Sequence, residues 1–249
     1  MLPVDGTPIE DGAVEIGEDG RIAAVGPAAE LGTGERFEDA VILPGFVNAH
    51  SHLEYAVYAG FGDGSSFVPW LSTHIERKRR IGLPEMEAIA RLGAAQCLAS
   101  GITTVGDASF SGAAVTACDE LGLRAIVYLE VFGEDASELT ERFEPMRDRV
   151  AGSLSDRVRL GISPHAPTTV GPELYAACAA TGLPVATHLA ESPPEEDWLL
   201  HGTGAYAELA DWLPPPAGTT GIRMLAARGL LGPGVVAAHC VTVDEEEIA

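Results

Sequence analysis

Short apolar runs alternate with longer stretches of helical periodicity along most of the chain. Six apolar runs are predicted to be buried parallel strands, and they span residues 41–48, 103–107, 125–131, 159–163, 185–188 and 235–239. Between them, apolar residues recur every three or four positions, which predicts helices over residues 84–100, 111–121, 137–150, 171–180 and 220–230. Repeated βα units of this kind favour an α/β fold.

The first forty residues follow a different pattern. Apolar and polar residues alternate on both sides of residues 18–20, Glu-Asp-Gly, which predicts two strands joined by a tight turn. We therefore expect a small β-unit over residues 1–40 and one larger domain over residues 41–249. The three consecutive prolines at 214–216 indicate a stiff corner between two helices rather than a linker.

Two arrangements suit the repeated βα units. A doubly wound sheet is the rival, but no GxGxxG follows the first strand of the repeat. Polar residues instead recur at the carboxyl ends of several strands, which is where barrel enzymes place their active sites. We expect a TIM-like (β/α)8 barrel, incomplete here with about six βα units.

Composition and charge narrow the function. With 249 residues, 46% of them hydrophobic, the chain is long enough to bury a core. A net charge of -22 disfavours nucleic acid and anionic membranes as partners, so a small molecule is expected. There is no run of about 18 apolar residues and no amino-terminal export pattern. The scattered cysteines Cys97, Cys118, Cys178 and Cys240 suit reduced thiols in the cytoplasm.

Histidines at the ends of predicted strands are the main candidates for chemistry. His50 and His52 form an HxH at the end of the first strand, and side chains two residues apart on a strand share one face. His188 ends the fifth strand, with Glu191 three residues later, a spacing that fits a third ligand and a proton shuttle. His239 ends the sixth strand. One such histidine alone is more often a core residue, but the coincidence of three strands indicates a metal site.

These segments resemble the amidohydrolase superfamily. PGFVNAHSHLE, GITTVGD, SPHAP, THLAE and AHC together extend from Pro44 to Cys240. They are most similar to the branch that contains cytosine deaminase, S-adenosylhomocysteine deaminase, chlorohydrolases and aminodeoxyfutalosine deaminase. The resemblance implies a metal-dependent barrel, with residues 1–40 as part of an accompanying β-sandwich.

The resemblance also implies roles for individual residues. His50, His52 and His188 correspond to metal ligands, and Glu191 to the general acid/base. His239 corresponds to a histidine that hydrogen-bonds the attacking water or the adduct. His165, between Pro164 and Pro167, corresponds to a substrate-contacting histidine.

Two departures from the superfamily pattern qualify this site. The fourth strand has no lysine to bridge a second metal, so one divalent ion is expected, with zinc preferred and iron(II) the alternative. The family's final ligand, an aspartate after the eighth strand, would lie beyond Ala249. The sequence looks truncated at both ends, because it begins inside what should be a first sandwich strand and lacks two barrel strands and the closing sandwich strands. Asp107 and Asp244 do not match that aspartate, and Asp244 is expected to cap a helix.

Other charged or titratable positions carry weaker predictions. His74 and His201 are expected at the surface. Residues 76–80, Glu-Arg-Lys-Arg-Arg, are expected to form a solvated helix face, with the alternative that they hold an anionic group of the substrate.

The leading function is hydrolytic deamination of an aminated heterocycle, specifically a purine nucleoside derivative. Residues 48–54 and 128–133 are most similar to enzymes that act on 6-aminodeoxyfutalosine in menaquinone biosynthesis. The alternatives are a chlorohydrolase, an amide or cyclic-amidine hydrolase of the same superfamily, and a non-catalytic barrel relative. A homodimer is left open as the assembly of the full-length form.

Overall fold

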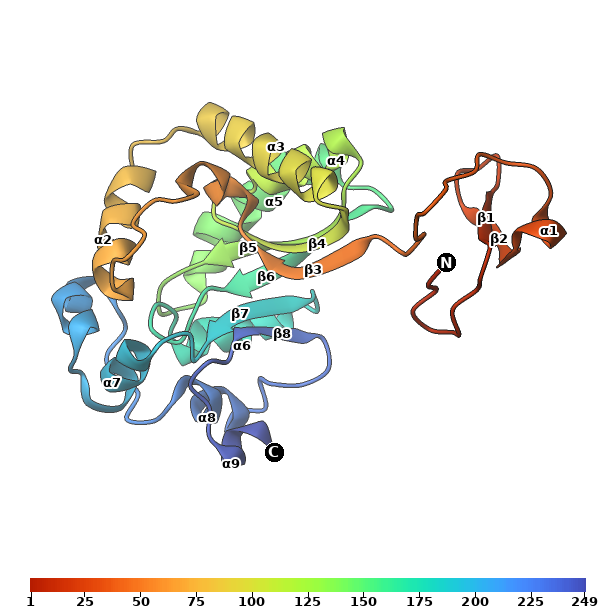
Figure 1. Ribbon diagram of the computed structural model, residues 1–249. Coiled ribbons are helices and arrows are strands. Elements are labelled where there is room, and N and C mark those ends of the chain that lie inside the picture. Colours follow the sequence, from red (N-terminus) through yellow and green to blue (C-terminus); the bar gives the residue numbers. More distant parts are fainter. The chain divides into compact units, whose positions relative to one another are not determined.

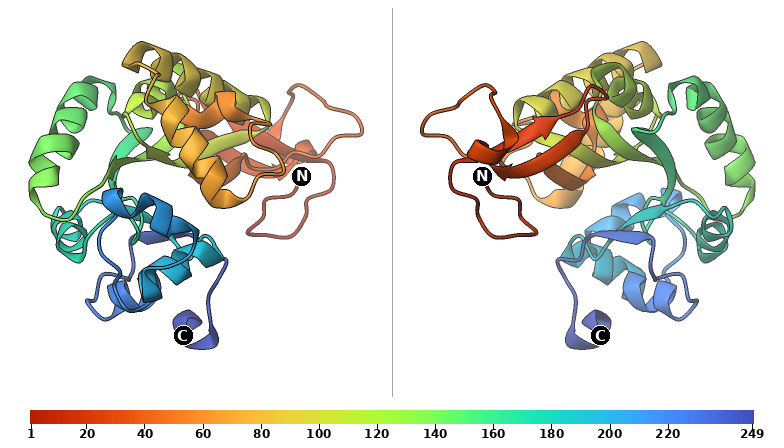
Figure 2. Two further views of the ribbon diagram at one scale, coloured as in Figure 1. Left: turned by 90° about the vertical axis from the view of Figure 1, so that its left-hand side faces the viewer. Right: turned by 90° about the vertical axis from the view of Figure 1, so that its right-hand side faces the viewer.

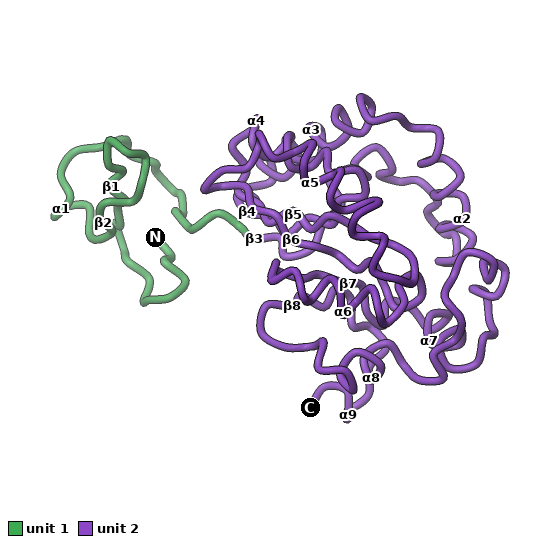
Figure 3. The backbone as a smooth tube through the Cα atoms, turned by 180° about the vertical axis from the view of Figure 1, so that it is seen from behind, with its two compact units in different colours: residues 1–46 green, residues 47–249 purple.

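Two compact units make up the chain, Met1–Phe46 and Val47–Ala249, in a computed structural model that describes residues 1–249 (Figure 3). The smaller unit holds the antiparallel strands β1 (Gly12–Ile16) and β2 (Ile22–Pro27), followed by the short helix α1 (Ala28–Leu31). Gly20 in the turn between the strands has φ 74°, a left-handed conformation that glycine adopts readily. The predicted hairpin is therefore confirmed. Most apolar side chains of this unit are exposed, so the hairpin has no apolar core of its own.

The larger unit contains one six-stranded sheet whose strand order is the order of the chain. Its strands are β3 (Phe46–Ser51), β4 (Ile102–Ser109), β5 (Arg124–Val131), β6 (Val158–Pro164), β7 (Val185–Leu189) and β8 (Val235–His239). The successive pairs from β4 to β8 are parallel. A doubly wound sheet would reverse its strand order at one point, so this order excludes that alternative.

Helices follow the strands and lie outside the curved sheet (Figures 1 and 2). The α-helices are α2 (Phe67–Lys78), α3 (Leu83–Ala99), α4 (Ala113–Leu121), α5 (Glu144–Val150), α6 (Pro172–Ala180), α7 (Pro193–His201), α8 (Gly221–Ala226) and α9 (Glu245–Ile248). The other helical segments are the 3-10 helices η1 (Leu53–Tyr58), η3 (Ala151–Ser153) and η4 (Ala205–Trp212) and the π-helix η2 (Leu139–Phe143). The arrangement is that of an incomplete (β/α) barrel, as predicted. None of the helices combines the length and apolar character needed to cross a membrane.

The core lies between the sheet and the helices. Strand β5 contributes Val127, Leu129 and Val131, each completely buried, and α4 contributes Val115 and Cys118. Strands β3 and β8 form the two edges of the sheet. All four cysteines are free thiols.

Some predicted boundaries are wrong for identifiable reasons. The first strand begins at Phe46, because Pro44 just before it cannot donate a ladder hydrogen bond. The helix expected over 137–150 is divided into the π turn η2 and the helix α5, and Pro145 near this junction lacks the N–H that a continuous helix needs. The last expected helix ends at Ala226 rather than residue 230.

Candidate metal centre and active site

The six predicted site residues all lie at the carboxyl ends of neighbouring strands. His50 belongs to β3, His188 to β7 and His239 to β8. His52 and His165 follow directly after β3 and β6, and Glu191 is the second residue after β7. Because the strands follow one another in a single sheet, their carboxyl ends meet at one end of the barrel.

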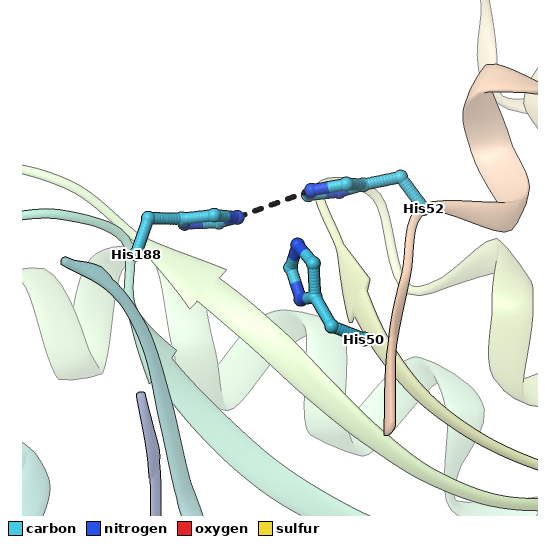
Figure 4. Close-up of side chains that lie close together, drawn as sticks. All are labelled: His50, His52 and His188. Carbon is cyan, nitrogen blue, oxygen red and sulfur yellow. Dashed lines mark hydrogen bonds between the residues drawn. The ribbon is translucent and has the colours of Figure 1, made fainter. Parts of the chain in front are cut away.

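Three histidines converge there (Figure 4). The Nε2 atoms of His52 and His188 are 3.1 Å apart. The ring centre of His50 lies 5.0 Å from that of His52 and 4.9 Å from that of His188, edge-on to both. One ring nitrogen from each residue lies within 4.8 Å of the others. The structure thus brings together the three residues that were expected to ligate the metal.

Backbone carbonyls fix the tautomers of two of these rings. Nδ1 of His52 is 2.9 Å from the carbonyl oxygen of Ala108, and Nδ1 of His188 is 2.7 Å from that of His165. A carbonyl oxygen only accepts hydrogen bonds, so each Nδ1 carries the proton. Each Nε2 of the neutral rings therefore presents a lone pair. Such outer hydrogen bonds are typical of metal-ligating histidines.

The electrostatics of the cluster favour a cation between the rings. Burial lowers the pKa of His188 to about 4, lowers that of His52 well below its usual range, and lowers that of His50. The rings are therefore neutral at pH 7, and two lone pairs 3.1 Å apart repel each other unless a cation binds both. Tetrahedral zinc with Zn–N bonds of 2.0–2.1 Å would separate its nitrogens by about 3.3 Å. The residues present fit a divalent metal.

Glu191 and His239 lie next to this cluster. Glu191 Oε1 is 3.5 Å from His239 Nε2, and the ring centre of His239 is 5.1 Å from that of His50. Burial, followed by the charge of Glu195, raises the pKa of Glu191 to about 7. Burial lowers the pKa of His239. A carboxyl group that titrates near neutrality can both accept and donate a proton under physiological conditions.

His165 is held firmly beside the cluster. Its Nδ1 is 2.8 Å from Thr169 Oγ1, and its ring centre lies 4.7 Å from those of Phe132 and His188. Its carbonyl oxygen is also the group that orients His188. His165 therefore supports the cluster through its backbone as well as facing it with its side chain.

One prediction about other residues is wrong. His74 is 2% exposed, not at the surface, because α2 turns it into a box formed by Tyr55, Tyr58 and Trp70. The run over residues 76–80 is exposed as predicted except at Lys78, which points inward: its Nζ donates to Tyr55 Oη at 3.0 Å. It also lies 3.9 Å from the centre of the Phe110 ring. His201 is exposed, as expected.

Sequence reasoning assigned no role to several buried carboxylates around the site. Asp107 Oδ1 accepts from Leu53 N at 2.7 Å and from Ser51 Oγ at 3.0 Å, and so fixes the segment that carries His52. Asp244, by contrast, is exposed and caps α9 with a complete capping box, as predicted. Neither Asp107 nor Asp244 belongs to the cluster of metal-ligand atoms.

Glu130, at the end of β5, is also completely buried. Neither of its oxygens has a hydrogen-bond partner, and Oε1 lies 3.8 Å from His165 Nε2. Burial raises the pKa of Glu130 to about 7, although Lys78 and Arg142 oppose the rise. The sequence signal for Glu130 is a carboxylate at the end of an apolar strand.

The chain forms an incomplete (β/α) barrel with a histidine cluster at the carboxyl ends of its strands, and comparison with known proteins gives its family. The chain belongs to the amidohydrolase family, whose pattern matches residues 41–249. It is 31% identical over 266 aligned residues to 5-methylthioadenosine/S-adenosylhomocysteine deaminase of Symbiobacterium thermophilum, covering 100% of this chain and 58% of that protein. The chain thus spans somewhat more than half the length of the curated relatives it matches.

Solved structures share the fold. Helicobacter pylori aminofutalosine deaminase in complex with methylthio-coformycin superposes with a TM-score of 0.71 at 24% identity, over 87% of this chain and 57% of that one. An adenosine deaminase from Xanthomonas campestris with bound zinc superposes with a TM-score of 0.67 at 22% identity, over 96% of this chain and 55% of that one.

Proposed function

We propose that this chain carries the greater part of the active site of a metal-dependent hydrolytic deaminase that acts on a purine nucleoside derivative. The observation that carries the proposal is the pairing of His52 and His188, whose Nε2 lone pairs face each other at 3.1 Å. Glu191, a carboxyl group with a pKa of about 7, lies beside the same cluster. The names of the relatives support the substrate class, since the Symbiobacterium protein is called a deaminase of adenosine derivatives.

His50, His52 and His188 would hold the metal. When bound there, a divalent ion would lower the pKa of water from 15.7 towards about 7, which makes hydroxide available at neutral pH. Zinc is our choice of ion, supported by the zinc in the Xanthomonas adenosine deaminase. Iron(II) is the alternative.

Glu191 would move the protons. It accepts a proton from the attacking water and donates it to the ring nitrogen next to the carbon that bears the amino group. The water oxygen bonds to that carbon. Glu191 then passes the second proton of this oxygen to the amino group. The C–N bond breaks, and its electron pair leaves with the nitrogen as ammonia. Such acid–base assistance is typically worth about 10²- to 10⁴-fold in rate.

His239 and His165 would act on the substrate. His239, whose Nε2 lies 3.5 Å from Glu191 Oε1, would donate a hydrogen bond to the oxygen that attacks. His165, whose ring centre lies 4.7 Å from that of His188, would orient the heterocycle. Within the nucleoside class we propose 6-aminodeoxyfutalosine, an intermediate of menaquinone synthesis, and the aminofutalosine deaminase among the structural neighbours is consistent with this choice.

Product analysis tests the proposed reaction. The longest reading frame that contains this chain is incubated with 6-aminodeoxyfutalosine, 5′-methylthioadenosine and S-adenosylhomocysteine. Ammonia release with formation of the 6-oxo purine is expected. Release of chloride from a chlorinated heterocycle, or of a carboxylate from an amide, would assign the site to the alternative hydrolases. Equal turnover by a Glu191→Gln variant would remove Glu191 from the mechanism.

A further inference from the structure

Glu195 lies behind the proposed acid/base and binds the peptide that carries it. Glu195 is the third residue of α7 and is 4% exposed. Its Oε1 accepts from Ala190 N at 3.0 Å and its Oε2 from Glu191 N at 2.8 Å. Both oxygens of a buried carboxylate are thus used on two consecutive backbone amides, one of which belongs to Glu191 itself.

The same peptide is held from the other side by the turn after β8. The carbonyl oxygen of Ala190 accepts from Val241 N at 2.9 Å and from Thr242 N at 3.1 Å. It also accepts from Thr242 Oγ1 at 3.3 Å. Because that turn begins at His239, these bonds join the segments that carry Glu191 and His239.

The backbone at this junction is in an unusual conformation. Ala190, His239 and Cys240 have φ values of 49°, 73° and 48°, in the left-handed region that residues with a Cβ rarely adopt. Such conformations persist only where surrounding contacts impose them, and they concentrate at functional sites. Glu195 and Thr242 supply those contacts for Ala190.

We propose that Glu195 is a positioning residue for the deamination reaction, which holds Glu191 against His239 through the Ala190–Glu191 amides and acts on it through its charge. This inference rests on the proposed function. A purely structural reading is that Glu195 caps α7, since a glutamate at the third helical position commonly accepts from the N-cap amide. Glu195, however, reaches past the N-cap Ser192 to the two residues before it.

The charge of Glu195 separates the two readings. The titratable groups that face Glu191 are Glu195 from α7, His239 from β8 and Tyr206 from η4. Of these, Glu195 helps to raise the pKa of Glu191 to about 7. If this charge is removed, the pKa of Glu191 falls, and activity persists to lower pH because the base stays ionised. A helix cap alone would not produce that shift.

The test uses Glu195→Gln, with Glu196→Gln as the matched control. Glu196 is the exposed neighbour on the same helix, so its replacement removes one negative charge without touching the peptide. In Glu195→Gln we expect unchanged metal content, turnover reduced about tenfold or more, and an acid limb of the pH–rate profile that moves to lower pH. Glu196→Gln should behave as the wild type. An unshifted acid limb in Glu195→Gln overturns the proposal.

A second measurement does not depend on turnover and so separates this inference from the proposed reaction. The carboxyl carbon of Glu191 is followed by NMR in glutamate-labelled protein and assigned by its loss in Glu191→Gln. Its pKa is expected to be lower in Glu195→Gln than in the wild type, and an equal pKa contradicts the proposal.

If Glu195→Gln does not fold, Thr242→Val tests the hydrogen bonds that hold the same peptide from the turn after β8. This neutral change removes one bond to the Ala190 carbonyl, so turnover is expected to fall while the pKa of Glu191 stays the same. Unchanged turnover in Thr242→Val then overturns the proposal.

Discussion

At the scale of single residues, we propose that the groups that would hold the metal differ from the groups that would move protons. Ring nitrogens of His50 and His188 lie within 4.8 Å of each other, whereas Glu191 lies beside His239. We expect His50→Ala and His188→Ala to lose both bound metal and turnover. Glu191→Gln should retain the metal and lose about 10²- to 10⁴-fold in turnover. Elemental analysis alongside kinetics checks this, and equal metal loss in all three variants would contradict the division of roles.

His165 is expected to act on the substrate without touching the metal. Its side chain stands between Phe132 and His188, while its carbonyl oxygen orients His188. Because His165→Ala keeps that carbonyl, metal content should be unchanged while KM rises or turnover falls. Steady-state kinetics with metal analysis tests this, and kinetics identical to the wild type would refute it.

His74 is a residue whose burial should be visible in the pH dependence of stability. Burial lowers its pKa from 6.5 to about 4, so the folded protein keeps it neutral while the unfolded chain protonates it below pH 6.5. Its contribution to stability is present above pH 6.5 and is lost as pH falls towards 4. In the His74→Phe variant the new ring should fit the aromatic box. Because this ring does not titrate, the variant should lose up to about 3 kcal/mol less of its free energy of unfolding than the wild type as the pH falls.

Urea unfolding at pH 7.5 and pH 5 checks the role of His74. We expect the wild type to lose more stability than His74→Phe between the two pH values. His201→Phe, which changes an exposed histidine, is the control and should lose as much as the wild type. Equal losses in all three proteins would show that His74 is protonated in the folded state as easily as in the unfolded one.

At the scale of the elements, the close packing of β4 against β3 positions the HxH segment. A Cβ on Gly106 of β4 would overlap the carbonyl oxygen of Ala49, the residue before His50. Gly106→Ala should therefore push the two strands apart, cost about 1 to 3 kcal/mol, and weaken metal binding about tenfold or more. Gly152→Ala, where an added Cβ meets nothing within 4 Å, is the control. Metal titration and thermal unfolding compare the two variants, and equal metal affinities would contradict this role of Gly106.

The sequence predicts strands better than it predicts what surrounds the site. The strand-terminal histidines can be predicted because a buried parallel strand is an uninterrupted apolar run, and the sequence alone shows where such a run ends. The burial of His74 and Lys78 was missed because their helix, α2, carries a mixed pattern whose inward face depends on contacts with η1 and Phe110. Glu195 was missed for a similar reason, since its partners are backbone amides that only the fold brings within reach.

At the scale of the whole molecule, the sheet has two open edges. Strands β3 and β8 each have one neighbour in the sheet, and Val47 of β3 is 69% exposed. Unpaired strand edges recruit other chains. Residues 1–249 expressed alone should therefore associate with rising concentration in size-exclusion chromatography and show at most trace turnover. Val47→Lys, which places a charge on the β3 edge, should reduce association. A monomer at every concentration with cooperative unfolding and full activity would contradict this expectation.

We propose that deamination requires one metal ion, held by His50, His52 and His188. The most direct test is ammonia release from a purine nucleoside by metal-stripped protein, in the longest reading frame that contains this chain, during titration with zinc. We expect no ammonia without metal, a linear rise up to one equivalent, and a plateau beyond it. Ammonia release at full rate by the metal-free protein, or a plateau that needs two equivalents, would contradict it.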